Sequence, residues 1–217
     1  MMDTAVTPAP RCRPTSRLLA LIALAAATLG VVLSGCGGDD KPATMVGYAL
    51  QPPTVVKDLS LPDATSGSPF AYQAPAGEVI IAYFGYTNCP DVCPTSLAAI
   101  KQALIRIGAD RAAKVRVAMA TVDPSRDTGD VLTPYVQSFV ANGSALRTTT
   151  DADLRKVADR FGVEYSVTTT AEGKIEVVHT GSMYIVDDQG VIADVLAFGV
   201  SPADIPNDLT ILLDRTG

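Results

Sequence analysis

Short apolar runs that alternate with amphipathic segments limit the folds open to this chain. Residues 79–83 and 115–122 are almost continuously apolar, as buried parallel strands are, and residues 95–107 between them carry apolar side chains at helical spacing. Further helices are expected at 131–140, 151–161 (with Asp151 as N-cap) and 201–213. Further strands are expected at 163–169, 174–178, 182–187 and 191–197. This order predicts an α/β sandwich, with a central mixed sheet flanked by helices and an added hairpin that turns at 188–190.

The N-terminal 35 residues have the pattern of an export signal. Arg11, Arg13 and Arg17 precede an uncharged run at 18–33, which is short for a membrane-spanning helix. The run ends in Leu-Ser-Gly-Cys, which resembles the lipobox of bacterial lipoproteins and implies cleavage before Cys36 and lipidation of its thiol. The alternative is an uncleaved anchor helix. Both interpretations place the remaining chain outside the cytoplasmic membrane.

We therefore expect a signal peptide at 1–35, a lipidated tether at 36–54 and one domain at 55–217. Prolines at 42, 52 and 53 favour an extended lead-in before that domain. Removal of the signal leaves 14 basic and 22 acidic residues, a net charge of −8. Because no basic run remains, nucleic acid is not an expected partner.

Two cysteines and one histidine are the candidate chemical groups. Cys12 leaves with the signal and Cys36 is expected to carry lipid, so Cys89 and Cys93 are the remaining thiols, and His179 is the only histidine in the chain. A thiol at a strand-to-helix turn has its thiolate stabilised by the helix N-terminus. Two thiols and an imidazole are ligands that copper prefers, whereas two thiols alone can perform disulfide exchange. A purely structural disulfide is the third alternative, although so short a loop would add little stability.

Several acidic residues surround this pattern. Asp91, between the cysteines, either tunes the sulfurs electrostatically or is a solvated acid. Asp123 either faces the site from the second strand or only ends that strand at Pro124. Arg126 and Asp127 are expected to form an ion pair within the following loop.

Three ordered motifs resemble the Sco/SenC family. They are Gly-Tyr-Thr-Asn-Cys-Pro-Asp-Val-Cys-Pro at 85–94, Thr-Val-Asp-Pro-Ser-Arg-Asp-Thr at 121–128, and Val-His-Thr-Gly-Ser-Met-Tyr-Ile-Val-Asp at 178–187. The resemblance spans roughly 55–213. It implies a membrane-anchored, thioredoxin-like copper protein that helps to assemble the binuclear copper centre of cytochrome c oxidase. It also implies that Cys89, Cys93 and His179 are the copper ligands. The lipobox departs from the membrane helix that is usual in the family.

The leading hypothesis is a copper metallochaperone, not primarily an enzyme, that carries one Cu(I) or Cu(II) ion per domain. Its expected partners are the copper-accepting subunit of cytochrome c oxidase and an upstream copper donor or thiol reductant. It is expected to be lipid-anchored on the extracytoplasmic face of the cell membrane. The alternative is a thiol–disulfide oxidoreductase that keeps the target's copper-ligand cysteines reduced, with Cys89 and Cys93 as the redox pair. A peroxide-reducing enzyme and a non-catalytic scaffold lipoprotein are weaker alternatives.

Overall fold

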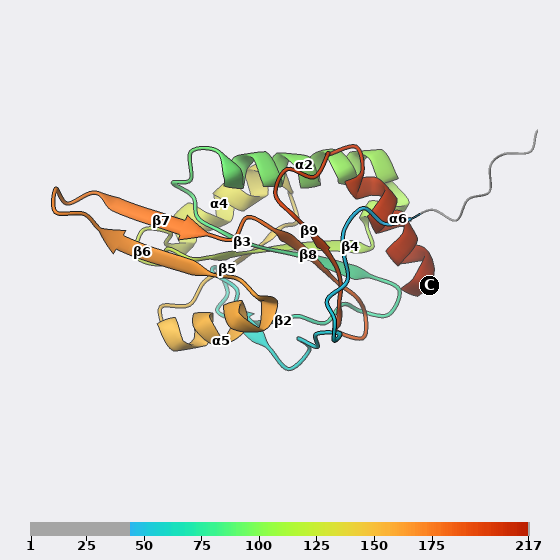
Figure 1. The fold of residues 1–217 in the computed structure, drawn as a ribbon, viewed down its shortest axis with the longest axis horizontal. Coiled ribbons are helices and arrows are strands. Elements are labelled where there is room, and N and C mark those ends of the chain that lie inside the picture. Colours follow the sequence, from blue (N-terminus) through green and yellow to red (C-terminus); the bar gives the residue numbers. More distant parts are fainter. Residues whose placement is uncertain (1–43, 217) are drawn as a thin grey trace, which may run out of the picture. The chain divides into compact units, whose positions relative to one another are not determined.

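A five-stranded mixed sheet forms the centre of the computed structural model, which describes residues 44–216 (Figure 1). In spatial order its strands are β5 (Ser144–Leu146), β4 (Val115–Thr121), β3 (Val79–Gly85), β8 (Met183–Val186) and β9 (Ile192–Leu196). β4 runs parallel to β3 and β5, whereas β8 is antiparallel to β3 and β9. The predicted α/β sandwich with a mixed sheet is confirmed.

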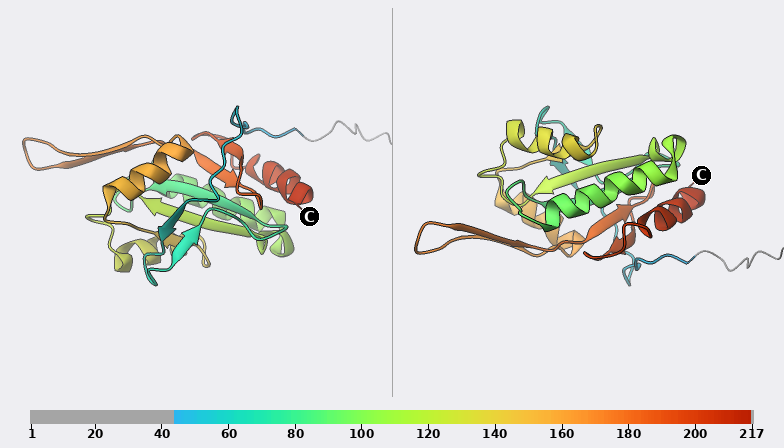
Figure 2. Two further views of the ribbon diagram at one scale, coloured as in Figure 1. Left: turned by 90° about the horizontal axis from the view of Figure 1, so that it is seen from below. Right: turned by 90° about the horizontal axis from the view of Figure 1, so that it is seen from above.

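Helices cover both faces of this sheet (Figures 1 and 2). One face carries α2 (Val92–Ile107), α4 (Gly129–Phe139) and α6 (Ile205–Thr216), and the short helix α3 (Ala109–Ala112) follows α2. The other face carries α5 (Asp151–Phe161) and the small hairpin of β1 (Ser60–Pro62) and β2 (Pro69–Ala71). Since side chains alternate along a strand, Ile81 and Tyr83 point toward α2, whereas Ala82 and Phe84 point toward α5.

Two hairpins follow α5. β6 (Tyr165–Thr169) and β7 (Ile175–His179) form a separate antiparallel ribbon that projects from the body of the molecule (Figures 1 and 2). Tyr165 pairs with His179 at the base of this ribbon, so the histidine lies where the chain re-enters the body. β8 and β9 form the second hairpin, with its turn at the predicted 188–190.

Several predicted boundaries were wrong. α2 begins at Val92, three residues before the predicted start at residue 95, and therefore includes Cys93. α6 begins at Ile205, because residues 201–204 form turns in which Ser201 Oγ accepts the N–H of Ala203. The N-cap of α5 is Thr150 rather than Asp151, and its side chain makes no capping hydrogen bond. Strand β5 and helix α3 were not predicted, because three and four residues are too few to show a periodic pattern.

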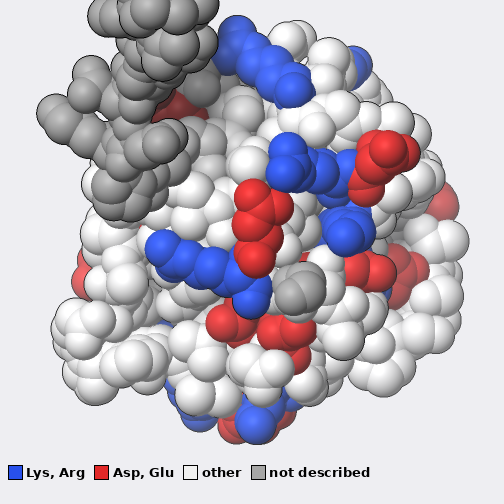
Figure 3. Space-filling view, turned by 90° about the vertical axis from the view of Figure 1, so that its right-hand side faces the viewer, with Lys and Arg blue, Asp and Glu red and all other residues white. Residues whose placement is uncertain are grey.

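The lead-in extends along the outer edge of the sheet. Tyr48 and Val55 form isolated bridges to Val195 and Val191, so residues 44–54, expected in the tether, contact the domain. Within 44–216, no helix combines the length and the apolar character that crossing a membrane requires. On the face seen in Figure 3, basic and acidic side chains of the described residues are intermixed.

Candidate metal centre

The two cysteines lie at the junction between the central strand β3 and helix α2. Cys89 lies in the connecting turn, and Cys93 is the second residue of the helix. Both are buried free thiols, with 9% of Cys89 and 0% of Cys93 exposed. The backbone N–H of Cys93 donates to Cys89 Sγ across 3.3 Å. Because the side chain of the N-cap residue Asp91 makes no capping hydrogen bond, the Cys89 sulfur takes an N–H that the helix start leaves unpaired.

A glycine lets the Cys93 sulfur approach the strand. A Cβ atom added at Gly85 would lie 2.8 Å from Cys93 Sγ and 2.8 Å from Tyr83 Cε1. Both distances are below any normal contact, so a side chain at this position would displace one of the two groups. The backbone N–H of Tyr86 points to the same sulfur, 3.5 Å away.

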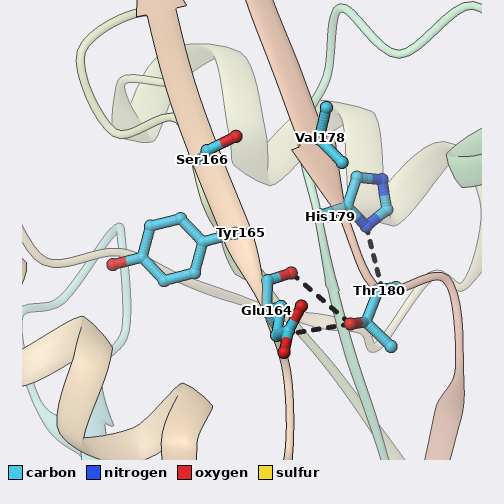
Figure 4. A pocket seen from close by; sticks show the side chains of 6 residues that line it. All are labelled: Glu164, Tyr165, Ser166, Val178, His179 and Thr180. Carbon is cyan, nitrogen blue, oxygen red and sulfur yellow. Dashed lines mark hydrogen bonds between the residues drawn. The ribbon is translucent and has the colours of Figure 1, made fainter.

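His179 completes the group from the end of β7. Its Nε2 lies 3.4 Å from Cys93 Sγ, and its Nδ1 lies 3.0 Å from the carbonyl oxygen of Thr180 (Figure 4). A carbonyl oxygen only accepts, so the proton is assigned to Nδ1, and the Nε2 lone pair faces the sulfur. The two sulfurs and a ring nitrogen lie within 4.8 Å of one another. The structure thus brings together Cys89, Cys93 and His179.

The surroundings of His179 are aromatic on one side and open on the other. The rings of Tyr86 and Tyr83 meet the imidazole edge to face, with centroids 5.7 and 6.3 Å away, and fix its orientation. A pocket of about 270 Å³ adjoins the histidine and includes Glu164 and Thr180 in its lining (Figure 4). A groove of about 460 Å³ lies between the cysteine turn and β7.

The two thiols differ in acidity. Burial raises the pKa of Cys89, but hydrogen bonds from groups at the start of α2, chiefly the N–H groups of Cys93 and Asp91, together outweigh it and leave the pKa below its usual value. Burial raises the pKa of Cys93 to about 12. Burial also lowers the pKa of His179, which keeps the imidazole neutral and able to bind a metal. Cys89 is therefore the more easily ionised sulfur.

The two acidic residues predicted near the site, Asp91 and Asp123, make other contacts. Asp91 is exposed, and its carboxylate accepts from the Thr95 hydroxyl across 3.3 Å. Asp123 is buried with 1% exposure and forms an ion pair with Arg126. The predicted pairing of Arg126 with Asp127 was therefore wrong: in this tight turn Arg126 Nε reaches back to Asp123. Neither Asp91 nor Asp123 belongs to the three-residue group.

Asp127 instead fastens the cysteine turn. It is fully buried, accepts from the Thr87 N–H (3.0 Å) and hydroxyl (2.5 Å), and accepts from the Thr121 hydroxyl at 2.6 Å. The sequence reasoning missed this role. Gly85 and Thr121 are partners in the parallel register of β3 and β4, so these two strands end side by side. Thr121 at the end of β4 and Thr87 just after β3 were therefore the available signal that Asp127 could bond to both.

The donor set suits a soft metal ion. Two sulfurs and one imidazole give the ligands that Cu(I) prefers, and they can hold Cu(II) with a further weak ligand. A closed zinc site would need four protein ligands, and the described residues supply three in this group. The same two thiols can also form a disulfide.

Comparison with known proteins identifies relatives across nearly the whole described region. The family model described as SCO1/SenC matches residues 49–214. Sco1 from Thermus thermophilus, solved in its apo form, is 28% identical, with a TM-score of 0.65 and coverage of 81% of this chain and 98% of that one. ScoI from Bradyrhizobium japonicum, solved with copper bound, is 29% identical, with a TM-score of 0.61 and coverage of 78% and 99%.

The match to a curated relative covers part of both chains. A protein from Stutzerimonas stutzeri described as copper-binding is 29% identical over 135 residues, which make up 62% of this chain and 65% of that protein. This chain thus spans slightly less than two thirds of that relative's length.

Proposed function

This chain belongs to the SCO1/SenC family, and we propose that it is a copper metallochaperone that holds one copper ion between Cys89, Cys93 and His179. The observation that carries the proposal is the convergence of two sulfurs and an imidazole nitrogen within 4.8 Å. The copper-bound structure of the Bradyrhizobium relative supports it.

The chemistry of this site suits release as well as binding. Thiolates bind Cu(I) tightly, and a three-coordinate ion leaves room for an incoming ligand. The groove of about 460 Å³ beside the cysteine turn gives such a ligand an approach to the site. Copper is then the cargo of the protein. Ligand exchange transfers the ion, and no covalent bond of the protein or the recipient is made or broken.

The proposed recipient is the copper-accepting subunit of cytochrome c oxidase, as the family resemblance implies. An upstream copper donor or a thiol reductant would load the site. We further propose that residues 1–35 are a cleaved signal, that 36–54 form the lipidated tether, and that 55–217 form the copper-binding domain. Lipidation of Cys36 would hold the domain at the extracytoplasmic face of the cell membrane, near a membrane-bound recipient.

A second function, thiol–disulfide exchange, is favoured by the unequal acidity of the two sulfurs. The Cys89 thiolate would attack a target disulfide, forming a mixed disulfide and releasing one target thiolate. Cys93, after losing its proton, would attack Cys89 Sγ and release the second target thiolate. The target gains two electrons and Cys89 and Cys93 lose two, so the target's cysteines become ready to accept copper.

Copper titration tests the proposal and separates the two functions. Reduced protein should bind one Cu(I) per chain, and His179→Ala should weaken binding by at least tenfold in competition with a chelator while keeping its thiol exchange activity. The disulfide form should not bind Cu(I) in the absence of reductant, because its sulfurs are uncharged. Unchanged affinity in His179→Ala would remove the histidine from the site, and tight binding by the disulfide form would contradict the thiolate mechanism.

A further inference from the structure

Tyr83 has a buried hydroxyl group that the fold does not use. The residue lies on the central strand β3, is 0% exposed, and its hydroxyl oxygen has no hydrogen-bond partner among the described residues. A buried polar group without a partner costs free energy that phenylalanine at the same position would not. The packing of β3 does not require this hydroxyl, so the side chains that it meets toward α2 are the place to look for its use.

The Tyr83 side chain lies near the Cys93 sulfur. The Tyr83 ring edge and Cys93 Sγ both lie 2.8 Å from the point that a Cβ at Gly85 would occupy. A tyrosine hydroxyl has a pKa near 10, so at neutral pH it keeps its proton and can donate a hydrogen bond. The buried Ser96 side chain lies beside the same hydroxyl.

Copper binding changes Cys93 Sγ from a hydrogen-bond donor into an acceptor. As a thiol, Cys93 faces the His179 Nε2 lone pair across 3.4 Å and can donate its proton to it. When Cu(I) binds, that proton leaves to solvent, the nitrogen turns to the metal, and the sulfur becomes a buried thiolate. Its one hydrogen-bond donor from the backbone in the described structure is then the long contact from the Tyr86 N–H at 3.5 Å.

We propose that the Tyr83 hydroxyl donates a hydrogen bond to Cys93 Sγ in the copper-loaded protein and thereby favours Cu(I) over Cu(II). The inference rests on the copper site proposed above. A hydrogen bond to a metal-bound thiolate withdraws electron density from sulfur, and it therefore weakens donation to Cu(II) more than it weakens binding of Cu(I). Tyr83 does not touch the metal and acts on it through Cys93.

Tyr83→Phe tests this inference because it removes one oxygen atom and leaves the packed ring. Tyr135→Phe is the matched control. The Tyr135 hydroxyl on α4 is also buried without a partner, but Tyr135, unlike Tyr83, is not among the nearest neighbours of the Gly85 position beside Cys93 Sγ. Both variants should fold, and neither should be less stable without metal than the parent, because each loses an unpaired buried group.

Three measurements on copper-loaded protein decide the outcome. In Tyr83→Phe the preference for Cu(I) over Cu(II) should fall roughly tenfold, as loss of a charge-assisted hydrogen bond predicts. The midpoint potential should fall with it, and the sulfur-to-Cu(II) charge-transfer band should move to longer wavelength. Tyr135→Phe should match the parent in all three.

The results separate this inference from the proposed function. Failure of the parent protein to bind one copper ion would overturn the copper site itself. Normal loading with identical potentials and spectra in the parent and Tyr83→Phe would overturn only the role of Tyr83. Equal shifts in both variants would also overturn it, because they would show a general effect of removing buried hydroxyl groups.

Discussion

At the scale of single residues, the metal centre depends on the space that Gly85 leaves for the Cys93 sulfur. An added methyl group would lie 2.8 Å from Cys93 Sγ and 3.2 Å from Met119 Cε. Gly85→Ala should therefore move the sulfur away from His179, lower Cu(I) affinity at least tenfold and destabilise the fold by about 1–3 kcal/mol. Chelator competition and thermal unfolding measure the two effects.

The control for this prediction is Gly108→Ala, the same change at the end of α2. Gly108 has a φ of +84° and open space around it, so alanine there is strained but meets no neighbour. It should destabilise by about 1 kcal/mol and leave copper affinity unchanged. If Gly85→Ala also kept full affinity, the close contact between β3 and Cys93 would not determine the site.

Residue types predicted the group of two cysteines and one histidine better than they predicted the residues around it. Cys89, Cys93 and His179 stood out because thiols and imidazoles are rare in this chain and have few uses other than chemistry. Tyr83 and Asp127 did not, because tyrosine in an apolar strand usually packs and because Asp127 follows Arg126, with which it was expected to form an ion pair. Their roles depend on which side chains the pairing of β3 with β4 brings together. Because the periodicity of apolar residues does not give strand order, the sequence could not show these contacts.

At the scale of elements, Asp127 joins the cysteine turn to the loop between β4 and α4. Asp127→Asn places an amide N–H₂ group where a carboxylate accepts from Thr87 and Thr121, so at least one hydrogen bond must weaken. The variant should lose about 1–3 kcal/mol of stability, and the Thr87 amide should exchange faster with solvent. Thermal unfolding and hydrogen exchange test this, with the exposed Asp130→Asn as control. Slow exchange at Thr87 in Asp127→Asn would show that the turn is held by other contacts.

Element prediction succeeded where the pattern was long and failed where local hydrogen bonds decide. The strands near 79–85 and 115–121 and the helices near 92–107 and 151–161 were predicted because their apolar spacing extends over several turns or residues. The start of α2 was placed too late, since Cys89 Sγ accepts the N–H of Cys93 in the first turn of the helix. The start of α6 was placed too early, since Ser201 Oγ accepts the N–H of Ala203 in a turn that precedes the helix.

At the scale of the whole molecule, a buried acidic pair makes stability depend on pH. Asp194 on β9 and Asp208 on α6 are both 0% exposed, and Asp208 accepts from the N–H groups of Val46 and Gly47 in the lead-in. Burial, together with the charge of Asp208, raises the pKa of Asp194 from 3.8 to about 7. Between these values the folded state keeps a proton that the unfolded state has released. The stability that Asp194 contributes therefore falls as the pH rises from about 4, and it is lost above about 7.

Asp194→Asn should remove this pH dependence, because the amide is neutral at every pH. Its stability relative to the parent should rise between pH 4 and pH 8 by about 4 kcal/mol, because three pKa units correspond to roughly that free energy. Denaturant unfolding of both proteins across this range measures the difference. The exposed Asp110→Asn on α3 should show no such rise, and a flat difference for Asp194→Asn would mean that Asp194 is ionised in the folded protein throughout.

The proposed attachment to the membrane is also a property of the whole molecule, and we expect it to depend on Cys36. Cys36 lies outside the described residues 44–216. It is not one of the three proposed copper ligands, so Cys36→Ser should leave the copper affinity of purified protein unchanged. In cells, the variant should move from the membrane fraction to the soluble fraction, because a serine cannot carry the thioether-linked lipid. Cys12→Ser is the control, since it changes a thiol that lies before the expected cleavage site, and it should remain at the membrane. If Cys36→Ser also stays at the membrane in full amount, the uncharged run at 18–33 is better interpreted as an uncleaved anchor helix. That helix, rather than a lipid, would then hold the domain near its recipient.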